Sequence, residues 1–115
     1  MRLVNSLFAK YISDRQGHKI LEDGAGFIIY KINEDECFIV DMYVDENIQQ
    51  TGRGKNLISA LADLARFEKC KYISANIHLW DKNANKTLLA ALYTGFKVVK
   101  AEVGILVILK EIEGV

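Results

Sequence analysis

The sequence predicts an α/β fold, in which helices pack on a mixed sheet. Three observations lead to this prediction. Residues 37–44 form an apolar, β-rich run, a short polar connection with two glycines follows, and helical periodicity begins there. Residues 72–79 then alternate between apolar and polar side chains, which is typical of a strand. A strand–helix–strand unit of this kind favours a parallel pair of strands among antiparallel hairpins, so the sheet is expected to be mixed.

The N-terminal half is expected to contain one helix and three strands. Two short strands, residues 18–21 and 26–32, flank a turn, and a polar turn at residues 33–36 leads into the strand 37–44. Ahead of them, three- and four-residue spacing of apolar residues predicts an amphipathic helix that ends near Gly17: Leu3, Leu7, Phe8, Tyr11 and Ile12.

The C-terminal half is expected to contain two helices and three strands. An apolar stripe predicts a helix that runs to about Glu68: Leu57, Leu61, Leu64 and Ala65. The strand 72–79 follows, and a shorter helix, residues 86–93, ends at Gly95. Residues 96–99 and 105–112 close the sheet as a pair of strands around a turn, which gives the order αβββαβαββ.

Composition narrows the possible functions. The 115 residues predict a single domain, residues 1–115. Because 15 Lys and Arg balance 15 Asp and Glu, the chain lacks the basic excess of a general nucleic-acid binder. No apolar stretch is long enough to cross a bilayer and no leader opens the chain, so no membrane partner is expected. Cys37 and Cys70 lack metal-binding spacing, which favours a reduced, cytoplasmic protein without a metal.

The connection after the strand 37–44 is the most informative motif. Gln49, Gly52 and Gly54 are arranged as Gln-x-x-Gly-x-Gly, and the next helix starts within this run. Free N–H groups and the positive end of a helix dipole would therefore face outward, which suits a phosphate or diphosphate. The spacing is neither that of a P-loop nor Gly-x-Gly-x-x-Gly. An isolated match of this kind is more often plain turn chemistry, so the rest of the chain has to decide.

Several elements in order resemble the GNAT superfamily of acyl-CoA-dependent N-acyltransferases. The resemblance covers residues 26–115. Its motifs are a strand ending in a hydrophobic–x–Val element, the glycine motif, a loop asparagine and a Gly-Phe pair. In this sequence they are Met42-Tyr43-Val44, then Gln49, Gly52 and Gly54, then Asn83 or Asn85, and finally Gly95-Phe96.

The resemblance implies a GNAT-like fold, with a mixed central sheet and helices on both faces, and acetyl-CoA as co-substrate. Two parallel strands, residues 37–44 and 72–79, would splay apart to admit the cofactor. Main-chain groups of the first strand would pair with the pantetheine, and the glycine loop would hold the diphosphate. The implied cofactor-binding residues are Met42, Tyr43, Val44, Gln49, Gln50, Thr51, Gly52, Arg53, Gly54, Lys55, Asn83 and Asn85.

The reaction that the resemblance implies is direct attack of an amine on the thioester, which needs a proton acceptor and a donor for the leaving thiolate. Tyr93 is the candidate donor, although the family's intervals point to Ala91 or Leu92; it is equally a helix-end packing residue. Asp41 or His78 could accept the proton through water.

Each of these residues also has a plainer interpretation. A hydrogen-bonded carboxylate near a strand bulge is favoured for Asp41, and a half-exposed strand residue for His78. Trp80 could wall an acceptor pocket, but packing against the final strands is favoured. The side chains of Arg53 and Lys55 could touch phosphates or simply face solvent, so the backbone of the loop is the favoured contact.

The N-terminal end departs from the family pattern. Relatives have a further strand and helix ahead of the first helix predicted here, and this short member is expected to lack both. An open acceptor side would suit a protein amine, or a second copy could complete it. The apolar run Ile105, Leu106, Val107, Ile108 and Leu109 favours burial on both faces or a homodimer.

Two functions follow from these observations. The first is an N-acetyltransferase acting on a small-molecule or protein amine, with the acceptor unidentified. The second is a catalytically silent GNAT-like domain that binds acyl-CoA or a partner protein as a regulatory module. An unrelated nucleotide-binding module is disfavoured because the chain lacks the P-loop's lysine–hydroxyl pair.

Overall fold

The computed structural model describes residues 2–3, 18–24, 26–44 and 53–112. Their elements, in chain order, are β1 (Arg2–Leu3), β2 (Lys19–Glu22), β3 (Gly26–Asn33), β4 (Glu36–Val44), α2 (Arg53–Phe67), β5 (Tyr72–His78), α3 (Ala84–Tyr93), β6 (Lys97–Glu102) and β7 (Ile105–Glu111).

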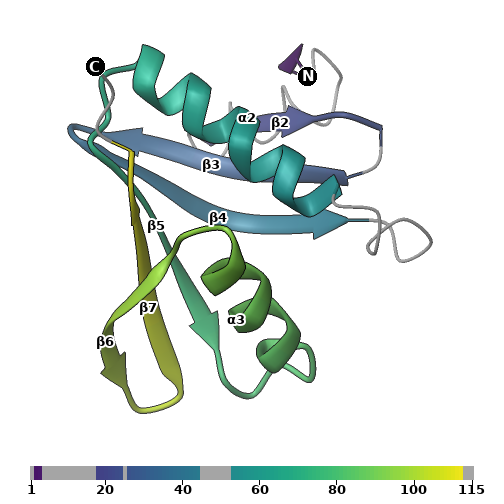
Figure 1. The fold of residues 1–115 in the computed structure, drawn as a ribbon, viewed down its shortest axis with the longest axis vertical. Helices are drawn as coiled ribbons and strands as arrows, with labels where there is room; N and C mark the ends of the chain where they lie inside the picture. Colours follow the sequence, from purple (N-terminus) through teal and green to yellow (C-terminus); the bar gives the residue numbers. More distant parts are fainter. Residues whose placement is uncertain (1, 4–17, 25, 45–52, 113–115) are drawn as a thin grey trace.

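These strands form one seven-stranded sheet in the order β1-β2-β3-β4-β5-β7-β6. The pair β4–β5 is parallel, and every other neighbouring pair is antiparallel. β4 and β5 can run parallel because the segment between them contains the crossover helix α2, and this pair lies near the centre of the sheet (Figure 1). The predicted mixed sheet and strand–helix–strand unit are therefore confirmed.

The N-terminus corrects the sequence prediction. Arg2 and Leu3 form strand β1, which pairs with Glu22 and Leu21 of β2, where apolar spacing had predicted a helix and no preceding strand. The edge of β2 offers unpaired backbone groups, and pairing with it outweighs the helical spacing of one leucine. The remainder of the predicted first helix lies outside the described residues.

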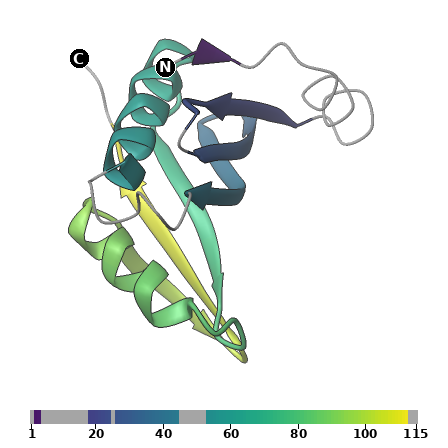
Figure 2. The same cartoon turned by 90° about the vertical axis from the view of Figure 1, so that its right-hand side faces the viewer.

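Both described helices cover the same face of the sheet (Figure 2). Leu57, Leu61 and Ala65 of α2 are fully buried against β3, β4 and β5. Ala84 of α3 is buried in the same apolar cluster, and Leu88 packs against it. The spacing of these residues along each helix is the reason that it packs with one face inward. The resemblance implied helices on both faces, and the helix that would supply the second face falls on residues outside the described ranges.

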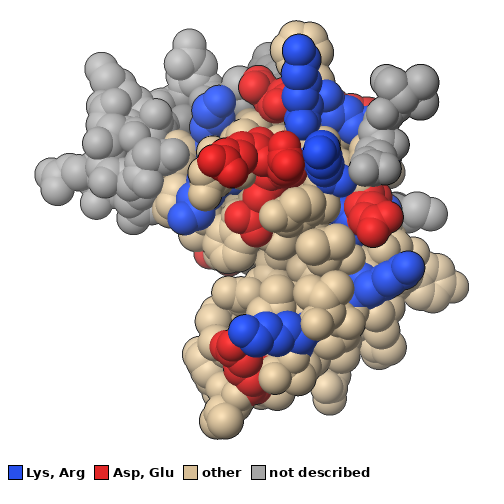
Figure 3. Space-filling model, turned by 90° about the vertical axis from the view of Figure 1, so that its left-hand side faces the viewer, with Lys and Arg blue, Asp and Glu red and all other residues tan. Residues whose placement is uncertain are grey.

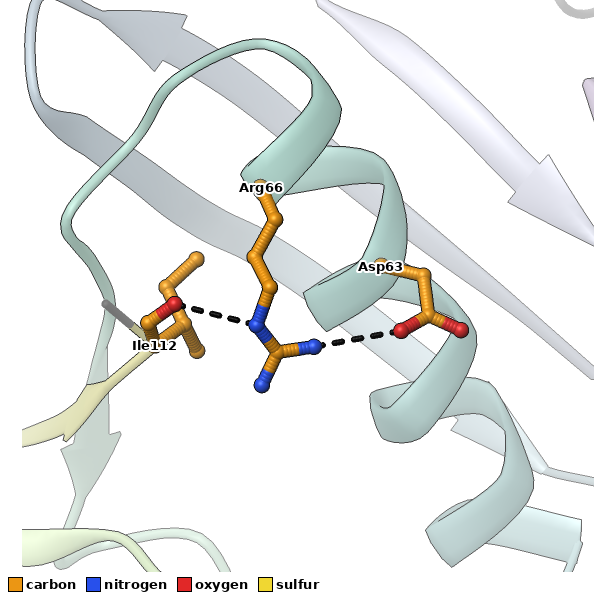
Figure 4. A network of polar contacts seen from close by, with 3 residues as sticks. All are labelled: Asp63, Arg66 and Ile112. Atoms are coloured by element: carbon orange, nitrogen blue, oxygen red, sulfur yellow. Dashed lines mark hydrogen bonds and ion pairs between the residues drawn. The ribbon is translucent and has the colours of Figure 1, made fainter. Parts of the chain in front are cut away.

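The end of α2 is joined to the end of β7. The Arg66 guanidinium donates from Nε to the carbonyl oxygen of Ile112 at 3.0 Å and from Nη1 to Asp63 at 3.1 Å (Figure 4). The backbone N–H of Ile112 donates to the carbonyl of Lys71, just before β5. These contacts fix the last strand of the chain to the central crossover unit.

Among the described helices, none is both long and apolar enough to cross a membrane.

Candidate functional site

The two parallel strands at the centre of the sheet pair over only part of their length. Their partners run from Glu36 and Tyr72 to Ile39 and Ala75, where the pairing ends. Residues 40–44 of β4 and 76–78 of β5 continue beyond that point and diverge (Figure 1); we call them the divergent segments. The predicted splaying of these strands is confirmed. Backbone groups in the middle of a sheet are thereby left without a neighbouring strand, and an extended molecule can pair with them.

A β-bulge in β4 lies at the start of the divergent segments. Ile29 of β3 is opposite Asp41, whereas Tyr30 is opposite Ile39, so Val40 is an inserted residue. A bulge bends its strand and increases the local twist. The bend therefore occurs immediately after Ile39, the last residue of β4 that pairs with β5.

The Asp41 side chain is held beside this bulge by the backbone of the next residue. Its Oδ1 accepts a hydrogen bond from the backbone N–H of Met42 at 2.8 Å, in an exposed position. The favoured interpretation of Asp41, a hydrogen-bonded carboxylate near a strand bulge, is therefore confirmed. The carboxylate remains exposed to solvent despite this hydrogen bond, so a reacting group can reach it.

Beyond Asp41, the side chains of β4 alternate again. Met42 is half-buried against the apolar cluster under the helices. Tyr43 is exposed, and its ring lies 5.8 Å from that of Phe27. Val44 ends the strand opposite Gly26. The backbone of residues 42–44 is thus anchored from both faces of the sheet, which gives it a fixed position.

The second divergent segment ends in an aromatic pair. His78 is exposed, and its ring centroid is 4.6 Å from that of Trp80. Trp80 lies against the β6–β7 turn, since a Cβ added at Gly104 would come within 3.1 Å of the indole. Trp80 is nevertheless 71% exposed, so the favoured packing against the final strands is limited to this contact with the turn. His78 is therefore positioned from two sides, by the β5 ladder and by the indole.

Tyr93 is the last residue of α3 and is 88% exposed. The helix is continuous from Ala84 to Tyr93, and the backbone N–H of Thr94 closes it on Ala90 and Ala91. Ala91 packs against the core, and successive helical residues rotate by about 100°, so Tyr93 points well away from the direction of Ala91. Asn83 and Asn85 lie at the start of the same helix and are both exposed.

The start of α2 lies beside the end of β4 (Figure 1). Arg53, Gly54 and Lys55 form the first turn of this helix, which contains no acidic residue. The N-terminal end of a helix carries partial positive charge, and no carboxylate of its first turn opposes it. Gln49, Gln50, Thr51 and Gly52 lie outside the described residues.

The two thiols lie away from the divergent segments. Cys37 is fully buried near the start of β4, and burial together with nearby Cys70 and Glu36 raises its pKa to about 12. Burial also raises the pKa of the Cys70 thiol. A thiol must ionise to act as a nucleophile, so neither cysteine is suited to that role. Within the part of the chain that the structure describes, no three His, Cys, Asp or Glu side chains are grouped as a metal site.

Comparison with known families decides the assignment. The model of the acetyltransferase (GNAT) family matches residues 5–93, most of the chain. The protein belongs to the GNAT family. The divergence of β4 and β5, which the resemblance to this family predicted, is therefore present in a member of the family. No curated protein matches the sequence.

Solved GNAT structures share this fold at low sequence identity. The PaiA N-acetyltransferase of Thermoplasma acidophilum, in complex with coenzyme A, is 17% identical with a TM-score of 0.68; the match covers 76% of this chain and 53% of that one. A GNAT acetyltransferase of Elizabethkingia anophelis with bound acetyl-CoA is 14% identical with a TM-score of 0.70, covering 94% and 83%. The ribosomal-protein-S18-alanine N-acetyltransferase of Escherichia coli is 20% identical with a TM-score of 0.64, covering 92% and 77%.

Proposed function

We propose that this GNAT protein is an N-acetyltransferase that moves an acetyl group from acetyl-CoA to a primary amine. The observation that carries the proposal is the end of β4–β5 pairing at Ile39 and Ala75, which leaves the rest of β4 free up to its end beside the start of α2 (Figure 1). A strand edge and a helix N-terminus suit the two chemically different parts of the cofactor. The edge pairs with the amide-containing arm, and the helix end attracts the diphosphate.

In this proposal the cofactor lies along residues 42–44 and reaches α2 with its diphosphate. The backbone of Met42, Tyr43 and Val44 pairs with the pantetheine, and the Met42 N–H polarises the thioester carbonyl. The diphosphate is held by backbone N–H groups at the start of α2 and in the run before it: Gln49, Gln50, Thr51, Gly52, Arg53, Gly54 and Lys55. Asn83 and Asn85, at the start of α3, complete the proposed cofactor-binding residues.

The proposed reaction is a direct transfer. The amine nitrogen attacks the carbonyl carbon, the carbon–sulfur bond breaks, and the amine loses a proton while the thiolate gains one. Asp41 or His78 accepts the proton, since both are exposed and lie on the two divergent segments. Tyr93 or water supplies the proton for the thiolate. A small-molecule amine and a protein amine both remain as acceptor classes.

Two experiments test this function in sequence. Calorimetric titration with acetyl-CoA tests binding, and release of free thiol with a panel of amines tests transfer. Comparing the wild type with Tyr93→Phe then tests the thiolate donor. We expect a fall in kcat of about tenfold or more if the hydroxyl donates, because general acids contribute roughly 10²–10⁴-fold.

A catalytically silent domain that binds acyl-CoA or a partner protein is the second candidate function. The 88% exposure of Tyr93 at the end of a regular helix favours it, because no bend in α3 directs the hydroxyl inward. A wild-type protein that binds acetyl-CoA but releases no thiol with any amine would support this candidate over the enzyme.

We further propose that two copies associate through β6. This strand is the edge of the sheet, and all six of its residues are exposed. Val98 and Val99 are 43% and 55% exposed, and Val103 in the following turn is fully exposed. The lower part of the molecule in Figure 3 is mostly uncharged surface, interrupted by a neighbouring pair of basic and acidic side chains. The free backbone groups of an edge strand are a template for pairing with another chain, and Val98, Val99 and Ala101 give β6 apolar side chains beside the charged Lys97, Lys100 and Glu102. Light scattering would report a dimer, and Val99→Lys would shift it to a monomer.

The compartment follows from the thiols. Both cysteines are free and buried, and we propose a reducing compartment, the cytoplasm, as the location of this protein.

A further inference from the structure

We propose that the Asp41 carboxylate competes with the acyl carbonyl for the backbone N–H of Met42, so that binding of an acyl-CoA releases Asp41. The proposal rests on the proposed function, in which that N–H polarises the thioester. It adds a competitor that belongs to the protein itself and links occupation of the acyl site to the freeing of a base.

The first step of the argument is the direction of the Met42 N–H. In an antiparallel ladder, alternate residues turn their N–H groups away from the neighbouring strand. We counted this alternation outward from the turn at residues 34–35, with Val40 as the inserted residue. By this count the Met42 N–H points away from β3. The 2.8 Å bond from this N–H to Asp41 Oδ1 agrees with that direction.

The second step is what lies on that side. The other neighbour of β4 in the sheet is β5, and its pairing with β4 ends at Ile39. The Met42 N–H therefore points into the divergence, where no strand takes it. Asp41 occupies a donor that would otherwise be offered to a bound molecule or to water.

The third step compares the two acceptors. A carboxylate makes a charge-assisted hydrogen bond, which is about twice as strong as one to a neutral acceptor such as a thioester carbonyl. The carbonyl has to displace the stronger acceptor, and Asp41, being exposed, then returns to solvent. When a binding site is blocked in some of the molecules, the apparent association constant is the intrinsic one multiplied by the fraction of molecules in which the site is open.

The consequence concerns the timing of proton transfer. While Asp41 accepts from Met42, one of its lone pairs is occupied; once a carbonyl replaces it, the carboxylate is free and lies next to the acyl group. Asp41 is then able to accept the proton of an attacking amine. The competition thus makes the base fully available only when the acyl donor is bound.

The experiment measures the dissociation constants of CoA and acetyl-CoA by calorimetry, without an amine, for the wild type, Asp41→Asn and Asp41→Ala. CoA lacks the thioester carbonyl of acetyl-CoA. The ratio of the two dissociation constants therefore isolates the competition for the Met42 N–H and cancels any general charge effect. Asp63→Asn is the control, because it removes a carboxylate from the exposed surface of α2.

We expect Asp41→Ala to improve the affinity for acetyl-CoA relative to CoA by about three- to tenfold, the range of one hydrogen bond at an exposed site. Asp41→Asn keeps a neutral acceptor and should lie between Ala and the wild type. Asp63→Asn should leave the ratio unchanged. In turnover with an amine, Asp41→Ala should lower both kcat and the KM for acetyl-CoA, which a purely structural role would not do.

A ratio that is equal in all four proteins, or equal in the Asn and Ala variants, overturns the competition while leaving the proposed function intact. A wild type that binds neither CoA nor acetyl-CoA overturns the proposed function and this inference together.

Discussion

Ile39 of β4 and Ala75 of β5 form the last pair across the parallel centre of the sheet, and the bulge at Val40 follows immediately. In β4, the pairing with β5 therefore ends directly before the residue at which the strand bends. The bulge turns β4 away from β5 while β4 stays paired with β3 as far as Val44. The centre of the sheet opens because β4 stays paired with β3, and the β3–β4 ladder is interrupted only at Val40.

The turn between β6 and β7 should be sensitive to a single methyl group. Gly104 has φ +77°, and an added Cβ would meet the Trp80 ring at 3.1 Å. Gly104→Ala should lower the free energy of unfolding by about 1–2 kcal/mol from backbone strain alone, with the clash adding to it. Urea unfolding measures this. The fluorescence of Trp80 should also change, since it is the only tryptophan of the chain.

Gly24→Ala is the matched control for that variant. Gly24 has a similar φ of +82°, but nothing lies within 4 Å of its added Cβ. Only the strain should appear, and the fluorescence should stay unchanged. Equal losses of stability at Gly24 and Gly104 would show that the Trp80 contact has no energetic weight.

Lys110 stabilises the end of α3. Its Nζ donates to the carbonyl oxygen of Thr94, the C-cap of the helix. A cation at a helix C-terminus interacts favourably with the dipole, so Lys110→Met should destabilise the protein by about 1 kcal/mol. Lys97→Met, on the exposed edge strand, is the control and should be close to neutral. Thermal unfolding followed by circular dichroism separates the two variants, and equal melting temperatures would refute the cap.

The two hydrogen bonds of Arg66 should contribute unequally to stability. Arg66→Ala removes the hydrogen bond to Ile112 and should cost about 1 kcal/mol of stability. Asp63→Ala removes only an exposed ion pair and should cost less than about 0.5 kcal/mol. Denaturant unfolding of both variants tests the order, and a larger loss at Asp63 would contradict it.

Stability should fall at alkaline pH. Burial raises the pKa of Cys37 from 9.0 to about 12 and that of Tyr30 from 10.0 to about 12. Above pH 9 the unfolded chain loses protons that the folded chain retains, so each pH unit up to about 12 favours unfolding. Urea unfolding between pH 8 and 11 should show this decline, and Cys37→Ala should reduce its slope. A flat profile over this range would contradict the raised pKa values.

The sequence predicted the elements of the central unit well because their signals are local. The apolar stripe of α2 and the alternation of β5 each reflect one buried face. The bulge at Val40 and the end of pairing at Ala75 depend on contacts between strands, and the resemblance to GNAT proteins supplied the splaying instead. A hydrogen-bonded Asp41 carboxylate near a bulge was the favoured interpretation from the sequence, but the donor, the backbone N–H of Met42, was identified only by the structure. Strand β1 was missed because two residues become a strand only through their pairing with β2, which leaves no local signal in the sequence.

Amide hydrogen exchange of residues 42–44, measured by NMR with and without acetyl-CoA, tests the central claim most directly. The account predicts that saturating acetyl-CoA slows exchange at Met42 and Val44, whose N–H groups face the divergence from β5, and leaves Tyr43, paired with Phe27 of β3, unchanged. Binding of acetyl-CoA with no added protection at Met42 and Val44 would contradict it.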